Sequence, residues 1–126
     1  MPAVLKIDRQ RRIVSSTFYG EIAGKDLLEH RERIKNDPEF DPSFAEVVDF
    51  SGVKMMSVSE SALMTLAGTQ SLFNKDVPHV LISPADLPKS LALQYRDIVR
   101  ESRPNIYVVG TLPEAQKLLG ELGYGL

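Results

Sequence analysis

The sequence contains no cysteine and no tryptophan, and it has no long hydrophobic run. Without cysteine there is no disulfide, no thiolate metal ligand and no thiol nucleophile. No apolar run approaches the roughly 18–20 residues that a membrane-spanning helix needs. The first residues are a short apolar stretch followed by charge, which is the reverse of the order in a secretory signal. We therefore expect a cytoplasmic protein without a membrane span.

An excess of charge of one sign is also missing. Lys and Arg number 15 against 17 Asp and Glu, for a formal net charge of −2. Because nucleic-acid-binding domains usually carry a clear basic excess, nucleic acid is not an expected partner. The composition, 43% hydrophobic and 25% charged over 126 residues, is typical of one globular domain spanning the whole chain.

Hydrophobic periodicity predicts strands alternating with helices. Short apolar or β-branched runs predict strands at 4–7, 12–19, 46–50, 79–83 and 105–109, with Gly20 ending the second. Helical spacing and capping residues predict helices at 24–36, from 57 to about 73, from about 86 to the Arg103-Pro104 break, and from 111 to Gly123. The order predicts an α/β fold, in which a mostly parallel five-stranded sheet begins with an antiparallel hairpin and carries about four helices.

The stretch 45–62 is the most informative part of the chain. We interpret it as a buried strand, a polar link at 51–56, and a helix starting at the capping box Ser57-Val58-Ser59-Glu60. Because parallel sheets place their sites at the carboxyl ends of strands, the polar residues here form a candidate interaction surface. Its members are Asp49, Ser51, Gly52, Ser57, Ser59 and Glu60.

Motifs for catalysis or cofactor binding are missing. The chain has no G-x-G-x-x-G, no P-loop and no G-x-S-x-G elbow. His30 is predicted as a surface or boundary residue of its helix and His79 as a satisfied residue at a strand boundary, neither of them a metal ligand. We expect no catalytic, cofactor-binding or metal-binding residue and a non-enzymatic protein. A hydrolase would need Asp49 in a closed pocket, with a pKa well above the ordinary ~3.9.

The segment Val47-Val48-Asp49-Phe50-Ser51-Gly52-Val53 resembles the STAS superfamily, the anti-sigma-factor antagonist domains of the SpoIIAA type. The chain is also similar to the SpoIIAA-like proteins often described as STAS/Sec14-type. Supporting stretches are Tyr19-Gly20-Glu21-Ile22, Asp26-Leu27-Leu28, residues 37–44, and Asp86-Leu87 with Leu91 and Tyr95. The resemblance implies a SpoIIAA-like fold with its helices mainly on one side of the sheet.

The resemblance also implies a regulatory or protein-interaction module that binds a protein partner or associates with itself as a homodimer. The family's phosphorylated serine falls on Val58, which has no hydroxyl group, and Glu60 replaces the following glycine. We therefore expect the usual phosphoserine switch to be absent. Phosphorylation of Ser57 or Ser59 remains open, because a helix N-terminus tolerates the added charge.

The Sec14 side of the resemblance implies an alternative, a carrier of a small apolar ligand or lipid. Its pocket would be lined by Met55, Met56, Met64, Phe73 and Tyr95. Methionine suits such a pocket because its side chain is flexible and polarisable, although the same residues also serve as ordinary core packing.

Overall fold

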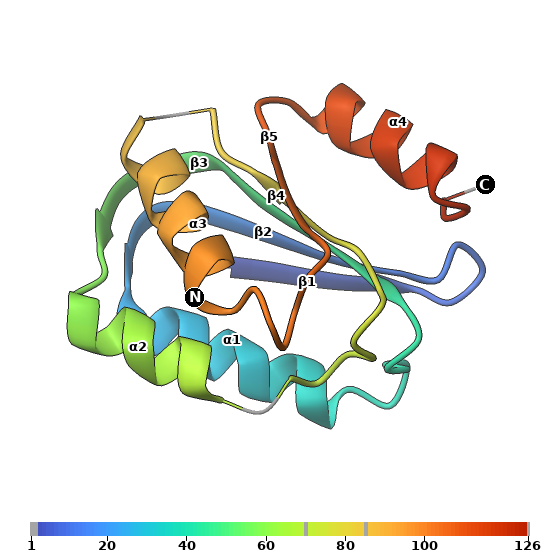
Figure 1. The fold of residues 1–126 in the computed structure, drawn as a ribbon, viewed down its shortest axis with the longest axis horizontal. Coiled ribbons are helices and arrows are strands. Elements are labelled where there is room, and N and C mark those ends of the chain that lie inside the picture. Colours follow the sequence, from blue (N-terminus) through green and yellow to red (C-terminus); the bar gives the residue numbers. More distant parts are fainter. Residues whose placement is uncertain (1–2, 70, 85, 126) are drawn as a thin grey trace.

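The computed structural model describes residues 3–69, 71–84 and 86–125, which form a five-stranded sheet and four helices (Figure 1). In chain order the elements are β1 (Ala3–Asp8), β2 (Ile13–Ala23), α1 (Gly24–Asn36), β3 (Ala45–Ser57), α2 (Glu60–Gly68), β4 (His79–Ile82), α3 (Asp86–Ile98), β5 (Ile106–Val109) and α4 (Leu112–Glu121).

The strands lie side by side in the order β1-β2-β3-β4-β5, so each one pairs with its neighbour in the sequence. β1 and β2 are antiparallel, and every later pair is parallel. The predicted α/β fold, a mixed and mostly parallel sheet with an N-terminal hairpin, is confirmed.

The helices cover the two faces of the sheet unequally. Successive residues of a strand point to opposite faces, and Val48 packs in a cluster with residues of α1, α2 and α3 whereas Val47 packs with α4. In Figure 1, α4 lies apart from α1 and α2, next to β5. Three helices therefore enclose one face, and α4 alone covers part of the other.

Two strands are longer than predicted. The predicted polar link at 51–56 is wrong, because β3 continues to Ser57 alongside β2. Between paired positions β2 advances from Thr17 to Tyr19 while β3 advances from Asp49 to Gly52, so β3 carries an extra residue, which is a β-bulge. Gly20 does not end β2 as predicted. Its φ of +71° allows a second shift in register within the strand.

The second helix is shorter than predicted, running from Glu60 to Gly68 rather than from 57 to about 73. Ser57 is still paired with Ala23 in the sheet, so the N-cap is Ser59, whose Oγ accepts a hydrogen bond from the Ala62 N–H at 3.0 Å. Two other predictions are confirmed: α1 has the predicted bounds, and Thr111 caps α4 by accepting a hydrogen bond from the Glu114 N–H. α3 ends at Ile98 rather than at the predicted Arg103-Pro104 break, because residues 99–102 form turns.

Candidate functional site

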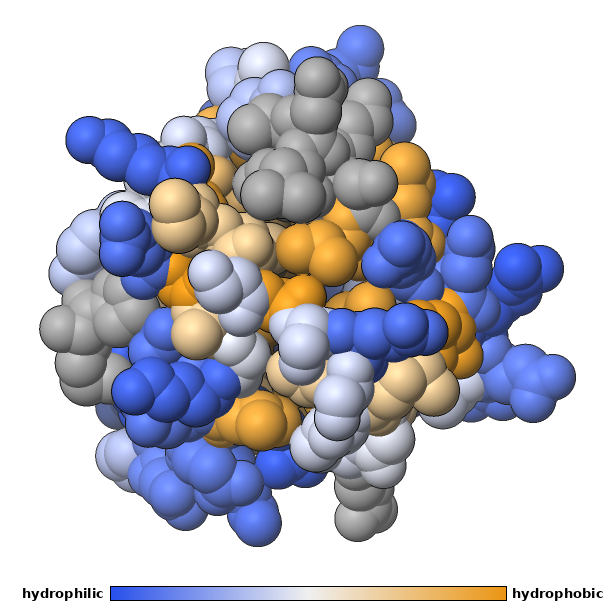
Figure 2. Space-filling view, turned by 90° about the vertical axis from the view of Figure 1, so that its left-hand side faces the viewer, coloured by the Kyte–Doolittle hydropathy of each residue, from blue (hydrophilic) through white to orange (hydrophobic). Residues whose placement is uncertain are grey.

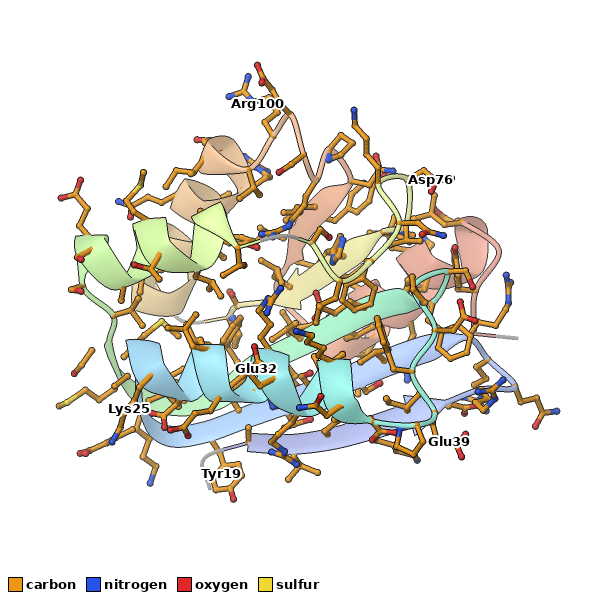
Figure 3. All side chains as sticks on the ribbon, turned by 90° about the horizontal axis from the view of Figure 1, so that it is seen from below. Tyr19, Lys25, Glu32, Glu39, Asp76 and Arg100 are labelled. Atoms are coloured by element: carbon orange, nitrogen blue, oxygen red, sulfur yellow. The ribbon has the colours of Figure 1, made fainter. Side chains whose placement is uncertain are left out.

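A cavity of about 160 Å³ lies between the sheet and the helices α1, α2 and α3. Most of its lining residues are apolar, among them Phe18, Leu27, Val48, Leu63, Leu81 and Ala92. The polar lining residues are His30, Arg31, Glu46, Thr69, Ser71, His79, Tyr95 and Arg103. In Figure 3, α1 and α2 lie in front of the sheet, and the labelled charged residues, such as Lys25 and Glu32, lie outside this enclosed layer.

The cavity is polar at one end and apolar at the other. Glu46 and His79 pair at the starts of β3 and β4, and the His79 Nδ1–H donates a hydrogen bond to the Glu46 carboxylate at 2.8 Å. Further along the chain, Phe50, Met56 and Val58 contribute only apolar lining. A bound molecule would therefore meet hydrogen-bonding groups at the strand starts and hydrocarbon near the end of β3.

The apolar end lies toward the end of the molecule where β3 finishes and α2 begins, at the left of Figure 1. Figure 2 shows this end face-on, with hydrophobic residues exposed in its middle and hydrophilic ones around them. The exposed hydrophobic residues of β3 and α2 are Met55, 52% exposed, and Met64, 53% exposed. The polar end is the more enclosed one, since His79 is 5% exposed and Arg103 6%.

Arg103 connects two helices across the polar end. Its guanidinium donates a hydrogen bond to the Thr69 carbonyl oxygen at 2.6 Å and another to the Tyr95 hydroxyl. Among the described residues, it forms no ion pair with a carboxylate. Burial raises the pKa of Tyr95 above its ordinary value, with Arg103 acting in the opposite direction. Tyr95 is therefore a neutral hydroxyl group at neutral pH.

His30 projects from α1 into the middle of the cavity lining, and it corrects a prediction. The sequence predicts a surface or boundary residue, but His30 is 5% exposed, because it shares with Leu27 and Ile34 the face of α1 that packs on the sheet. Its Nε2 shares a hydrogen bond of 2.6 Å with Ser16 Oγ, and its ring lies 4.9 Å from that of Phe18. Its Nδ1 has no hydrogen-bond partner among the described residues.

We expect His30 to make the protein less stable in mild acid. Burial lowers the pKa of His30 below its ordinary value and Arg33 lowers it further, against an opposing effect of Glu46. As the pH falls, His30 is therefore protonated in the unfolded chain, at a pH of ~6.5, before it is protonated in the native state. The free energy of unfolding is unaffected by protonation of His30 above ~6.5 and decreases as the pH falls below this value. The slope for one proton is limited to about 1.4 kcal/mol per pH unit.

Urea denaturation of the wild type and of His30→Gln, at about pH 7.5, 6.5 and 5.5, measures this contribution. The carboxylates titrate in both proteins, so the difference between the two curves isolates His30. The wild type should lose more free energy of unfolding than the variant over this range. Parallel pH profiles for the two proteins would contradict the expectation.

The candidate interaction surface is not compact in the structure. Asp49 lies at the β-bulge of β3, where its carboxylate accepts a hydrogen bond from the Ser51 N–H at 2.8 Å. Ser51 and Ser57 are six positions apart on the extended β3, which corresponds to about 20 Å. Ser59 is occupied as the cap of α2, with Glu60 in its first turn. Ser51, Gly52, Ser57, Ser59 and Glu60 are exposed.

Three of the residues predicted for an apolar pocket line the cavity: Met56, Phe73 and Tyr95. Met55 and Met64 do not line it, because their side chains are directed to solvent. Of the polar lining residues, the sequence analysis names Tyr95 for the pocket and misses the others. A signal for His30 was available, since its spacing from Leu27 and Ile34 is helical, but nothing local distinguishes Arg103 from an ordinary residue that ends a helix.

The described residues include no group of three or more His, Asp or Glu side chains that would hold a metal ion. Asp49, the residue that a hydrolase would need in a closed pocket, does not line the cavity. No helix in the part of the chain that the structure describes is long and apolar enough to cross a membrane.

The strand order and the arrangement of helices define an α/β protein with a SpoIIAA-like fold. A similar solved structure is that of an uncharacterized protein from the DUF3478 family with a SpoIIAA-like fold, from Shewanella loihica PV-4. The two structures have a TM-score of 0.62, and the match covers 93% of each chain at 11% sequence identity. No protein-family model matches this chain, and no curated protein sequence matches it significantly. The fold expected from the resemblance is therefore confirmed.

Proposed function

We propose that this protein binds a small, largely apolar molecule in the cavity between the sheet and α1–α3, and that it does so without chemical conversion. The observation that carries the proposal is the cavity itself, about 160 Å³ and lined mainly by apolar side chains. Protein interiors are close-packed and contain few voids larger than a water molecule. A concave apolar site with a few converging polar groups is the usual form of a small-molecule site.

The volume limits the size of the ligand. An engineered cavity of about 150 Å³ lined by Leu, Ile and Phe stays dry and takes up benzene, whereas sites for drug-sized molecules span roughly 300–1,000 Å³. The cavity at about 160 Å³ therefore suits a body the size of one aromatic ring or a short branched chain. A long-chain lipid, as a Sec14-type carrier would hold, needs more space.

A protein-interaction function stands second. The residues proposed for it are spread over about 20 Å of β3, and the Asp49 carboxylate is used within the bulge. The exposed Met55 and Met64 near the end of β3 support a contact with another protein or a second copy of this chain. The cavity combines an apolar lining with several polar groups, whereas these two methionines have no such set of polar groups around them. We therefore rank ligand binding above protein interaction.

Toluene is a suitable neutral probe for the apolar part of the cavity. Because a ligand that binds only the native state raises its stability by about 2.7 kcal/mol at a concentration of 100 Kd, near-saturating toluene should raise the midpoint of thermal unfolding by several degrees. Leu66→Trp, which places a larger ring at the cavity wall, should abolish this rise. Leu122→Trp, at a position 41% exposed just after α4, is the matched control and should respond as the wild type does.

Amide chemical shifts measured with toluene provide an independent readout. They should change for residues of α1, α2 and α3 and stay unchanged for α4, which packs on the other face of the sheet. No rise in the unfolding midpoint of the wild type, or an equal rise in Leu66→Trp, would refute the proposal.

A further inference from the structure

We propose that the ligand is a small monocarboxylic acid, whose carboxylate is bound by Arg103 and Tyr95 at the polar end of the cavity and by His30 from the middle of its lining. This inference rests on the proposed function, since it names the chemical class of the molecule held in the same cavity. Three observations on the described residues support it: a buried guanidinium without a carboxylate partner, a buried imidazole nitrogen without a hydrogen bond, and a neutral hydroxyl group that accepts a hydrogen bond from this guanidinium.

The first observation concerns the charge of Arg103. A buried charge is costly unless it is paired, yet Arg103 is 6% exposed and forms no ion pair among the described residues. Of its N–H groups, one is directed to the Thr69 carbonyl and one to the Tyr95 hydroxyl, and the others have no hydrogen-bond partner among the described residues. The planar guanidinium suits two parallel hydrogen bonds to a carboxylate.

The second observation concerns the carboxylates already present. Glu46 is the only carboxylate among the described lining residues, and it accepts the hydrogen bond of His79. Arg31 and Arg103 are the two arginines of the lining, and Arg31 forms an ion pair with Glu32 at 3.2 Å. The positive charge of Arg103 therefore stands without a carboxylate partner among the described residues, and one negative charge from the ligand would neutralise it. A phosphate dianion would exceed it, which favours a carboxylate.

The third observation concerns His30 and Tyr95. The Nδ1 of His30 has no hydrogen-bond partner within the described part of the chain, although its side chain is 5% exposed and lines the cavity. When Ser16 donates to Nε2, the Nδ1 carries the hydrogen and becomes a donor. The Tyr95 hydroxyl oxygen accepts a hydrogen bond from Arg103, so the hydroxyl hydrogen can be donated to a different acceptor. Both groups suit the oxygens of a carboxylate and would remain unsatisfied beside a hydrocarbon.

Benzoate, benzamide and toluene form a matched set of probes, because they share one ring and differ in the group attached to it. In isothermal titration at one pH near neutrality, the wild type should bind benzoate at least about tenfold more tightly than benzamide. Arg103→Met, which keeps an apolar stem, should lose this preference and retain binding of toluene. Arg100→Met removes an arginine that is 75% exposed, and should leave all three affinities unchanged.

Each outcome has a distinct meaning. Preference for benzoate in the wild type that disappears in Arg103→Met supports the inference. Binding of toluene without a preference for benzoate over benzamide overturns it and leaves the proposed function intact, whereas no binding of any probe overturns both. If Arg103→Met fails to fold, Tyr95→Phe removes only one hydroxyl group and should lower the affinity for benzoate several-fold without changing that for toluene. Equal benzoate affinity in Tyr95→Phe and the wild type would then contradict the inference.

Discussion

Replacement of Phe18 by alanine should lower the free energy of unfolding by about 3–5 kcal/mol. Phe18 is 2% exposed on β2, and its ring stacks on Phe50 at 5.4 Å and meets His30 edge-on at 4.9 Å. Removing the ring takes away its burial and its aromatic contacts, and it enlarges a cavity that the neighbours already fail to fill. Since domains are typically stable by only about 5–15 kcal/mol, this loss is a large share of the total.

Urea denaturation monitored by circular dichroism measures the effect, and Val4→Ala is the control. Val4 is 54% exposed on the adjacent strand β1, so its truncation should cost less than about 1 kcal/mol. A loss of similar size in both variants would mean that Phe18 contributes through strand propensity rather than through burial, and it would count against the packing described here.

Replacement of Gly24 by alanine should also destabilise the protein, although alanine favours helices. A Cβ at this first residue of α1 would lie 2.5 Å from the Cβ of Ala62 on α2, closer than two side chains can approach. Overpacking of this kind costs about 1–3 kcal/mol, whereas the gain from restricting the unfolded chain is about 0.4–1 kcal/mol. The clash should therefore dominate, with a net loss of about 1–2 kcal/mol.

A double-mutant cycle with Ala62→Gly tests the contact directly. Once Ala62 has lost its Cβ, Gly24→Ala should no longer destabilise, so the two changes should couple favourably by about 1 kcal/mol or more. Gly120→Ala is the matched control, because nothing lies within 4 Å of the added Cβ on α4, and it should be neutral or stabilising. Additive effects of Gly24→Ala and Ala62→Gly would show that α1 and α2 do not touch at this point.

The parts of the fold that depend on local signals were predictable from the sequence. The bounds of α1 follow from its spacing of apolar residues and from the proline at position 38, and Thr111 marks the start of α4 with its side chain. The end of β3 was not predictable in this way. Residues 51–57 are mostly polar or exposed, and they are extended because β2 supplies hydrogen-bond partners that lie far away in the sequence.

The site depends still more on tertiary structure. A periodic pattern can indicate that Met56 or Tyr95 faces the interior. Whether the interior side chains fill the space or leave a cavity depends on the distances between α1, α2 and α3, which the sequence pattern does not give. For the same reason, the burial of Arg103 follows from a contact with Thr69, 34 positions earlier in the chain. The family resemblance indicated a pocket, and only the structure reveals the polar side chains at one end of it.

The pairing of every strand with its neighbour in the sequence has a consequence for how the protein is made on the ribosome. Contacts between segments close in sequence form quickly because the loops to be closed are short, so we expect the sheet to grow by one strand at a time from the N-terminus during synthesis. The groups that enclose the polar end arrive late: Tyr95 and Arg103 emerge only after four strands are complete. A nascent chain that stops before Tyr95 would contain much of the apolar lining of the cavity but neither of the two residues proposed to bind the carboxylate at its polar end.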